Sequence, residues 1–351
     1  MSKIRMGVIG CRVGSRWVDA AKVCDETEAF AVADLDRELA QEMVDKHGVE
    51  RVYGDYRELL ADDDVDAVGV ATGPDIRKAM VIDALNAGKH VLVQKPHGQT
   101  ADDVREINEA AAARSSQTLM YSYFGRHNIE HRESRDLIAE GAIGRVYHLR
   151  VHYHYRERGE NYEPAESQRW LYEWGSKGGA LGQHGSHYLD MAWYLAGCPK
   201  PEWAFAACHT AFPTTMEVKK HSEDYMSLLA GFEGGITLQM DASSVIPTWS
   251  DRAWDLRLRV LGTKGTIELE SGREHGTRRL LGAIYDDGDN FTEEHREHSL
   301  GDFHTEIADF AAAIHDRQPP NVAPEEALTF MKLMDAIYLS AESGEKVKIE
   351  G

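Results

Sequence analysis

The chain of 351 residues is long enough for two domains, and its 42% hydrophobic and 28% charged residues exclude a disordered or collagen-like protein. With 39 basic and 59 acidic side chains, the net charge of −20 argues against binding of nucleic acid, because the chain would repel phosphate backbones. No apolar run approaches the ~20 residues of a membrane span, and the first residues lack the layout of a secretory signal. The four cysteines form no C-x-x-C pair, so we expect free thiols and a cytoplasmic protein.

The first third of the sequence alternates short apolar runs with helical patterns. Strands joined by helices pair in parallel through right-handed crossovers, and such a sheet is covered on both faces. The pattern therefore predicts an α/β fold, with a doubly wound parallel sheet over residues 1–121. Strands are expected at 4–10, 29–36, 66–73 and 90–94, and helices at 15–23, 37–48 and 79–88.

After about Tyr121 the pattern changes to long strands with few helices between them. The run 146–155 alternates face by face, and Gly234-Gly235 is a strong hairpin signal. Residues 122–351 are therefore expected to form an α+β domain with a large, mainly antiparallel open sheet, whose final helix packs back toward the first domain. Further strands are expected at 203–211, 225–232, 236–242, 256–261 and 266–270, and helices at 182–195, 303–315 and 324–342.

Glycines cluster at the first strand-to-helix junction, where the sequence reads Gly10-Cys11-Arg12-Val13-Gly14. A glycine-rich turn there lets backbone N–H groups approach a pyrophosphate, although the usual spacing G-x-G-x-x-G is not kept and a tight turn without a ligand is the alternative. Asp34 follows the last of these glycines by 20 residues, the position of an acid that binds ribose hydroxyls. Because Asp34 and Asp36 would repel a 2′-phosphate, the sequence favours NAD over NADP.

Lys95 comes directly after the expected strand 90–94 and before a proline. The carboxyl edge of an open α/β sheet is where such folds bind ligands. A lysine there could bind a substrate hydroxyl and stabilise the alkoxide that forms as hydride leaves. The alternative is a surface lysine at the end of a strand.

Five segments in chain order give the sequence a resemblance to a known family. They are GVIGCRVG with Asp34, DAVGVATGPDIRKAMVIDALNAGKHVLVQKP, GGALGQHGSHYLDMAWYLAG, LRVLGTKGTIELE and DAIYLSAESGEKVKI. Together they resemble the glucose–fructose oxidoreductase / inositol dehydrogenase / MocA family of nicotinamide-dependent enzymes over nearly the whole chain. The resemblance implies an N-terminal Rossmann domain, and a C-terminal sheet through which copies of the chain form homodimers or homotetramers.

The resemblance also implies roles for individual residues. Lys95 matches the catalytic lysine, and His187 matches the histidine expected to act as acid or base, since imidazole titrates near neutrality. The contacts to the cofactor are then expected from Gly10, Arg12, Val13, Gly14, Asp34, Thr72, Gln94 and Lys95. Substrate contacts are expected from Arg126, Arg169, Trp170, Gln183, His184 and His187. The alternative for either arginine is a structural ion pair, and for His187 it is a core histidine.

The chain departs from the family pattern at three positions. Gln94 and Gln183 stand where carboxylates are usual, and Arg77 stands where the loop often has histidine. An amide orients a hydroxyl but takes no proton, so His184 or Asp190 would have to replace the missing carboxylates. These departures leave the nucleotide assignment intact and leave the substrate and the proton relay open.

Two patterns could in principle hold a metal ion. His184, His187 and Asp190 are spaced along one helix side, and the strand 146–155 places His148, His152 and His154 on one face. Because hydride transfer in this family needs no metal, we expect none at either place.

The sequence therefore favours an NAD-dependent oxidoreductase acting on a CH–OH group of a sugar, cyclitol or related polyol. One alternative is an NAD-dependent enzyme of the same family that cleaves glycosides by oxidation, elimination and reduction. The other is a nucleotide-sensing protein without catalysis.

Overall fold

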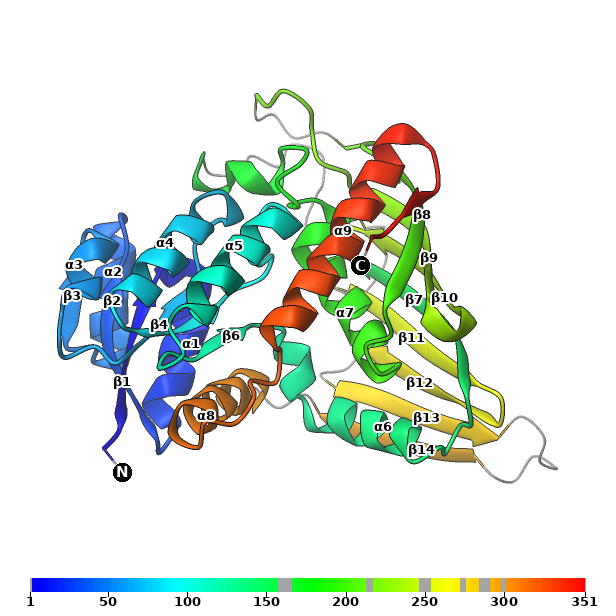
Figure 1. The fold of residues 1–351 in the computed structure, drawn as a ribbon, viewed down its shortest axis with the longest axis horizontal. Helices are drawn as coiled ribbons and strands as arrows, with labels where there is room; N and C mark the ends of the chain where they lie inside the picture. The colour runs from blue at the N-terminus through cyan, green and yellow to red at the C-terminus, as the bar shows by residue number, and fades with distance from the viewer. Residues whose placement is uncertain are drawn as a thin grey trace. The chain divides into compact units, whose positions relative to one another are not determined.

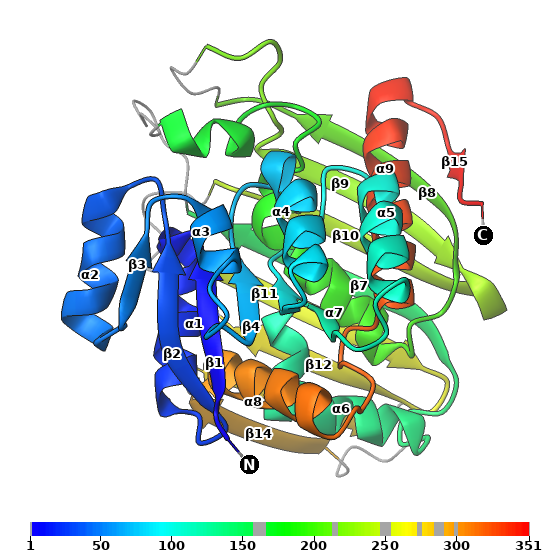
Figure 2. The ribbon, with the colours of Figure 1, turned by 60° about the vertical axis from the view of Figure 1, so that its left-hand side comes forward.

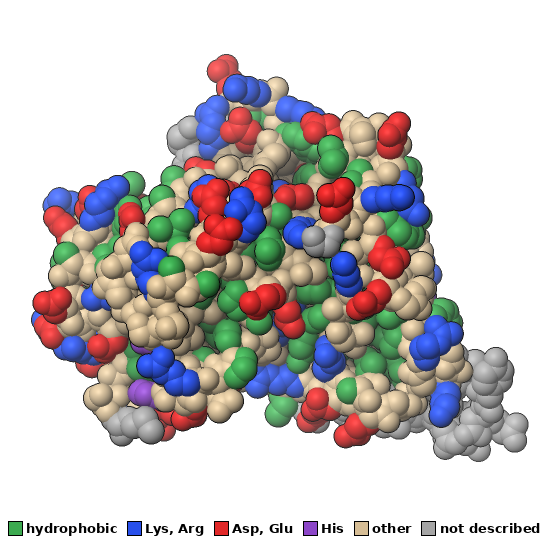
Figure 3. All heavy atoms as spheres, in the orientation of Figure 1, with side chains coloured by type: hydrophobic (Ala, Val, Ile, Leu, Met, Phe, Trp, Pro, Cys, Tyr) green, Lys and Arg blue, Asp and Glu red, His purple; other side chains and the backbone are tan. Residues whose placement is uncertain are grey.

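The computed structural model describes residues 2–156, 166–212, 217–245, 254–271, 276–283, 291–297 and 301–350. It consists of two compact units (Figure 1). The first comprises Met1–His127 and Leu300–Met331, and the second comprises Asn128–Ser299 and Lys332–Gly351. No helix among the described residues combines the length and the apolar character needed to cross a bilayer. Acidic and basic side chains are interspersed on the face drawn in Figure 3.

The first unit is built on a six-stranded parallel sheet of order β3-β2-β1-β4-β5-β6, the arrangement of a Rossmann fold. This confirms the predicted doubly wound domain. Its strands are β1 Ile4–Ile9, β2 Thr27–Ala33, β3 Arg51–Tyr53, β4 Ala67–Val70, β5 His90–Val93 and β6 Leu119–Tyr121. Its helices are α1 Cys11–Val23, α2 Arg37–His47, α3 Tyr56–Leu60, α4 Pro74–Asn86, α5 Ala101–Ala112, the 3₁₀ turn η1 Phe124–His127 and α8 Gly301–His315.

Apolar side chains from α1, α2 and α8 pack against one face of this sheet, while α4 lies between α3 and α5. Trp17 of α1 is fully buried, and its indole N–H donates to Glu306 of α8 at 2.8 Å. A Cβ at Gly69 of β4 would lie 2.6 Å from the Trp17 ring, so only glycine fits under this side chain. α9, Pro324–Ser343, contributes its residues up to Met331 to this unit, where Phe330 packs against Tyr123.

The second unit contains a nine-stranded sheet of order β14-β13-β12-β11-β7-β10-β9-β8-β15 in the described part of the chain (Figure 2). Neighbouring strands are antiparallel except β7 and β10, which confirms the mainly antiparallel sheet. The strands are β7 Val146–Tyr155, β8 Pro201–His209, β9 Tyr225–Phe232, β10 Ile236–Ser243, β11 Trp254–Gly262, β12 Gly265–Ser271, β13 Gly276–Ala283, β14 Phe291–Glu297 and β15 Val347–Lys348. The helical segments are α6 Ile129–Ala139, η2 Glu166–Leu171, η3 Leu181–Gly185 and α7 Ser186–Leu195, with η4 Glu233–Gly235 between β9 and β10.

The predicted hairpin at Gly234-Gly235 is confirmed, because both glycines have positive φ and join the antiparallel strands β9 and β10. The strands β3, β6, β13, β14 and β15 were not predicted. The helix expected at 182–195 begins with a π-helical turn, Leu181–Gly185, before it continues as α7.

The second sheet has one covered face and one accessible face. α7 packs against β7 and β11, and the side chains on that face, such as Leu149 and Val151, are buried. The side chains that alternate with these along the strands lie on the other face, which is accessible. Examples are Arg150 of β7, Phe205 of β8 and Leu229 of β9, which are exposed. Large apolar side chains on an otherwise polar sheet face are typical of a contact surface.

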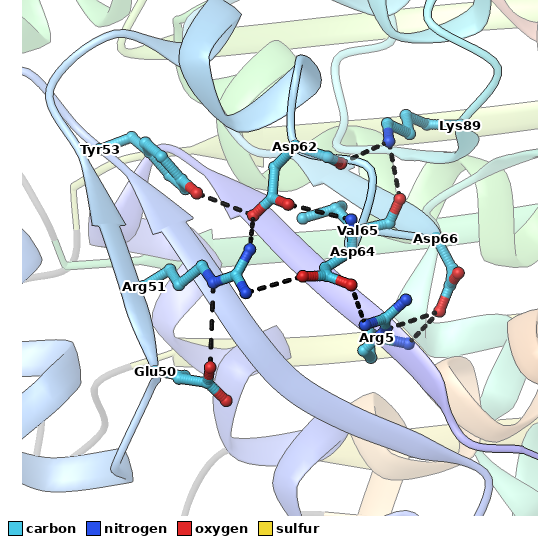
Figure 4. A network of polar contacts seen from close by, with 9 residues as sticks. All are labelled: Arg5, Glu50, Arg51, Tyr53, Asp62, Asp64, Val65, Asp66 and Lys89. Carbon is cyan, nitrogen blue, oxygen red and sulfur yellow. Dashed lines mark hydrogen bonds and ion pairs between the residues drawn. The ribbon is translucent and has the colours of Figure 1, made fainter.

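A charged network joins β1 and β3 to the loop that precedes β4 (Figure 4). Arg51 donates to Asp62 and Asp64 at 2.6 and 2.7 Å, and Arg5 donates to Asp64 at 2.6 Å. Burial of the Asp62 carboxyl opposes its ionisation, but hydrogen bonds from Tyr53 and Arg51 outweigh burial and lower its pKa to about 2. The network stabilises the edge of the sheet opposite to the one where Lys95 lies.

Candidate functional site

The carboxyl ends of four parallel strands bring the predicted nucleotide-binding residues to one edge of the first sheet. Ile9, the last residue of β1, is paired in register with Ala33 of β2 and Val70 of β4, and Val70 is paired with Val93 of β5. The residues that follow these ends are therefore neighbours: Gly10, Asp34, Ala71, Thr72, Gln94 and Lys95.

The turn after β1 requires both of its glycines. Gly10 has φ 92°, and a Cβ there would lie 3.0 Å from the carbonyl carbon of Ala71. Gly14 lies inside α1, where a Cβ would meet Val8 at 2.5 Å. Because α1 begins directly at Cys11, Arg12 occupies the first helical turn and the usual middle glycine is not needed. The first-turn N–H groups of a helix are a ready site for a phosphate.

Asp34 is fixed by two backbone N–H groups, from Cys11 at 2.7 Å and from Asp36 at 2.9 Å. Burial, together with the charges of Asp34 and Asp36, raises the pKa of the Cys11 thiol to about 12. The edge is therefore negative where a ribose would lie, which fits the two hydroxyls of NAD better than a 2′-phosphate. The glycine turn, the helix N-terminus and Asp34 together fit a dinucleotide.

Arg77 of α4 is a buried residue whose role the sequence did not predict. Its guanidinium donates to the carbonyl oxygens of Thr72 and Pro96, so it joins the loop after β4 to the loop after β5. Burial lowers the pKa of Arg77 to about 9, which still leaves it charged near neutral pH. In the second loop, Gln94 is buried and its side-chain carbonyl accepts the backbone N–H of Lys95 at 2.8 Å. Gln94 thus shapes the backbone that carries Lys95.

A buried imidazole lies two residues after Lys95. His97 contacts the rings of Tyr121 and Tyr123 at centroid distances of 4.6 and 4.7 Å, and burial lowers its pKa to about 3. The charges of Arg77, Arg126 and Lys95 lower the pKa of His97 further. Arg126 is itself buried and forms an ion pair with Glu326. This contact is the structural ion pair that was the alternative to substrate binding for this arginine.

His187, Gln183 and His184 lie together in the second unit, at the junction of the π-helical turn and α7. His187 is in the first turn of α7 and only 9% exposed, while Gln183 and His184 are partly accessible. The His184 ring packs against Tyr155 of β7 with centroids 4.5 Å apart. π-Helical turns inside helices occur frequently at functional sites. Asp190, three residues further along α7, is fully buried.

Glu223 orders the turn that precedes His187, and the sequence analysis missed it. Its carboxylate is fully buried, accepting the N–H of Leu181 at 3.1 Å and the hydroxyl of Tyr338 at 2.9 Å. Burial, with the charge of Glu223, raises the pKa of Tyr338 well above its usual value, so this hydroxyl remains a donor. A Cβ at Gly179 would lie 2.2 Å from the Glu223 carboxyl group, so the backbone can approach Glu223 this closely only at a glycine. The glycine pair 178–179 was therefore the one sequence signal of the contact with Glu223.

Arg169 and Trp170 lie in η2, in the second unit. Arg169 donates to the carbonyl oxygen of Glu217, and the carbonyl oxygen of Trp170 accepts a hydrogen bond from Ser176. Both residues are partly accessible. The structure therefore places Arg126, Lys95 and the glycine turn in the first unit, and Arg169, Trp170, Gln183, His184 and His187 in the second.

The three strand histidines that suggested a metal ion do not act alike. His148 is hydrogen-bonded to the hydroxyl of Thr237 at 2.8 Å, whereas His152 and His154 both contact the same oxygen of Asp241. His152, His154 and Asp241 form a group of potential metal ligands, because their donor atoms all lie within 4.8 Å of one another. Among the described residues, this is the group of at least three such ligands.

The chain matches models of two domains over nearly all of its length. Residues 4–123 match the NAD-binding Rossmann fold of an oxidoreductase family, and residues 135–349 match the C-terminal alpha/beta domain of the same family. The family is the one that the five sequence segments resemble, and the first unit is therefore an NAD-binding Rossmann domain.

Characterised relatives and solved structures agree with these matches. The chain is 27% identical to a myo-inositol 2-dehydrogenase of Thermotoga maritima, with 99% of each chain covered. It is also 27% identical to a 1,5-anhydro-D-fructose reductase of Ensifer adhaerens, with 99% of this chain and 98% of the relative covered. Its fold matches that of an oxidoreductase domain protein from Kribbella flavida with a TM-score of 0.88 at 21% identity, with all of both chains covered. A levoglucosan dehydrogenase in complex with NADH and levoglucosan matches with a TM-score of 0.87 at 20% identity, covering 99% of this chain and 100% of the other.

Proposed function

Since this chain belongs to the glucose–fructose oxidoreductase / inositol dehydrogenase / MocA family of oxidoreductases, we propose that it oxidises or reduces a sugar, cyclitol or related polyol with NAD. The observation that carries the proposal is the carboxyl edge of the first sheet, where the dinucleotide-binding turn follows β1 and Lys95 follows β5, with only β4 between these strands. The substrate class rests on the names of the relatives, which are dehydrogenases and reductases of inositol, anhydrofructose and xylose.

The residues that would hold the cofactor are those of the carboxyl edge. The first turn of α1, with Gly10, Arg12, Val13 and Gly14, would bind the pyrophosphate, and Asp34 would accept hydrogen bonds from the adenosine ribose. Thr72, Gln94 and Lys95 would border the nicotinamide side. When bound, NAD supplies a hydride acceptor, and its reduced form supplies a hydride donor.

Two side chains would serve the substrate. The Lys95 ammonium would donate a hydrogen bond to the reacting hydroxyl and stabilise the developing alkoxide. His187 would take the hydroxyl proton during oxidation and return it during reduction. Gln183 would orient a second hydroxyl, since an amide both donates and accepts but carries no charge. His184, Arg169 and Trp170 would complete the substrate contacts, whereas Arg126 is buried in its ion pair with Glu326 and would have a structural role.

A screen for formation of NADH with a panel of polyols and cyclitols tests this proposal. We expect turnover of at least one substrate, and a loss of kcat of at least about a hundredfold in His187→Ala and Lys95→Ala, the usual range for general acid–base groups. Lys46→Ala is the matched control, because Lys46 pairs with Glu42 on the exposed surface of α2.

The same screen separates the alternative functions. Release of an aglycone from glycosides without accumulation of NADH would replace the proposal by glycoside cleavage. Binding of NAD with no chemistry on any ligand would replace it by nucleotide sensing.

We also propose that the accessible face of the second sheet joins copies of this chain into a homodimer or homotetramer. Phe205 and Leu229 support this proposal, since they are 41% and 45% exposed on neighbouring strands of that face. Light scattering with Leu229→Lys tests it: we expect dissociation, and a wild-type chain that is monomeric would refute it.

A further inference from the structure

We propose that the second sheet binds a divalent transition-metal ion, such as Zn²⁺ or Co²⁺, through His152, His154 and Asp241. This inference is independent of the proposed hydride transfer. It concerns the accessible face of the sheet, where β7 runs between β10 and β11.

Strand geometry brings the three ligands together. His152 and His154 are two residues apart on β7 and therefore project from the same face. Asp241 of β10 is paired in register with His152 and diagonal to His154. The register of a central strand pair fixes these positions more firmly than a loop would.

The donor atoms are arranged as ligands of one ion would be. Nδ1 of His152 and Nε2 of His154 both lie 2.8 Å from the same oxygen of Asp241. The three donor atoms lie within 4.8 Å of one another. In a tetrahedral zinc site with bonds of ~2.0–2.1 Å, neighbouring ligand atoms are about 3.3 Å apart, so small shifts suffice to admit an ion.

A second carboxylate lies near the site. Asp255 of β11 lies 3.9 Å from Nε2 of His152, the ring nitrogen that does not face Asp241. A carboxylate that accepts a hydrogen bond from this nitrogen would orient a metal-binding imidazole and raise its basicity, and Asp255 would need to approach further to take that role.

The surroundings leave room for an ion and its water. A pocket of about 240 Å³ is lined by Arg150, His152, Asp241, Asp255, Arg257 and Arg259. Of its three arginines, Arg259 is paired with Glu268 at 2.7 Å and Arg257 lies 3.8 Å from Asp255, which reduces the repulsion of a cation by these two, and Arg150 is exposed to solvent. Two imidazoles and one carboxylate favour zinc, cobalt or nickel over magnesium or calcium, and leave a coordination position for water.

Titration of the untagged, chelator-treated full-length chain with Co²⁺, followed by its visible absorption, tests this site. We expect one equivalent of Co²⁺ per chain, displaced by Zn²⁺. His152→Ala, His154→Ala and Asp241→Asn should each weaken binding by at least about tenfold, since even partners that only orient a ligand cost that much.

His148→Ala is the matched control, because His148 shares the strand face but is bonded to Thr237. We expect it to bind Co²⁺ within about twofold of the wild type. The proposal fails if the folded wild-type chain takes up no stoichiometric Co²⁺, which would leave a simple histidine–aspartate ion pair. It also fails if the His148 variant loses as much affinity as the three ligand variants.

Discussion

Arg77 donates a hydrogen bond to the carbonyl oxygen of Pro96, the residue directly after Lys95. A second hydrogen bond from the same guanidinium reaches the carbonyl oxygen of Thr72. One buried side chain therefore sets the spacing between two loops that are expected to border the nicotinamide. A planar group with several donors can do this, whereas an ammonium group on a flexible chain cannot hold the same fork geometry.

We expect Arg77→Lys to retain the positive charge but to lose one of the two loop contacts. Loss of a charged hydrogen bond in a buried place should lower the free energy of unfolding by about 2 kcal/mol. Displacement of Lys95 should also lower kcat by about tenfold, with a smaller change in the KM for NAD. Steady-state kinetics and thermal denaturation measure these effects, and Arg114→Lys is the control on a more exposed arginine that follows α5. Unchanged kcat at equal folded fraction would show that Arg77 has no positioning role.

The second prediction concerns the choice of cofactor. Asp34→Asn removes the charge and keeps an acceptor for only one of the N–H groups of Cys11 and Asp36, which bond to different oxygens of Asp34. We expect the Kd for NADH to rise about tenfold and the preference for NAD over NADP to shrink, because the repulsion of a 2′-phosphate is weakened. NADH fluorescence titration measures the affinity, with the exposed Asp25→Asn as control. An unchanged Kd would show that Asp34 does not contact the ribose.

Much of the first unit could be predicted from its sequence, because its strands are short apolar runs separated by helices and obey local rules. The sequence predicted a first helix from residue 15, whereas α1 begins at Cys11. Gly14 is typical of a turn in the sequence, and its close fit against Val8 depends on the packing of α1 on β1, which the local sequence does not report. In the second unit, β13 and β14 were missed because segments such as TRRLLG and FTEEHRE do not alternate cleanly. Arg77 bonds to backbone carbonyl groups of two loops, and Glu223 acts through partners 42 and 115 residues away, so no helix or strand pattern reports either role.

A third prediction follows from the buried His97. Its pKa of about 3 lies below the value of ~6.5 of an unfolded histidine, so between these values only the unfolded state binds the proton. Stability should therefore fall as the pH decreases from 6.5, by up to about 1.4 kcal/mol per pH unit from this group. His97→Gln keeps a donor toward the carbonyl oxygen of Ser122 and should show a shallower decrease.

Urea denaturation of both proteins between pH 4 and pH 7 measures the difference. Parallel pH dependences for the wild type and His97→Gln would mean that other groups cause the acid sensitivity. His47→Gln is a suitable control, because His47 pairs with Asp19 near the surface of the same unit.

The last prediction addresses Gln183, which lies four residues before His187 and stands where a carboxylate is usual in the family. In Gln183→Asp, a negative charge near the imidazole would favour its protonated form. Since oxidation requires the neutral base, the acid limb of the profile of kcat/KM against pH should move to higher pH by about one unit. Gln183→Asn changes the length of the side chain without adding charge and should leave the limb in place. If the limb stays fixed in the aspartate variant while kcat changes, a group other than His187 carries the proton, and Asp190 or His184 becomes the next residue to substitute.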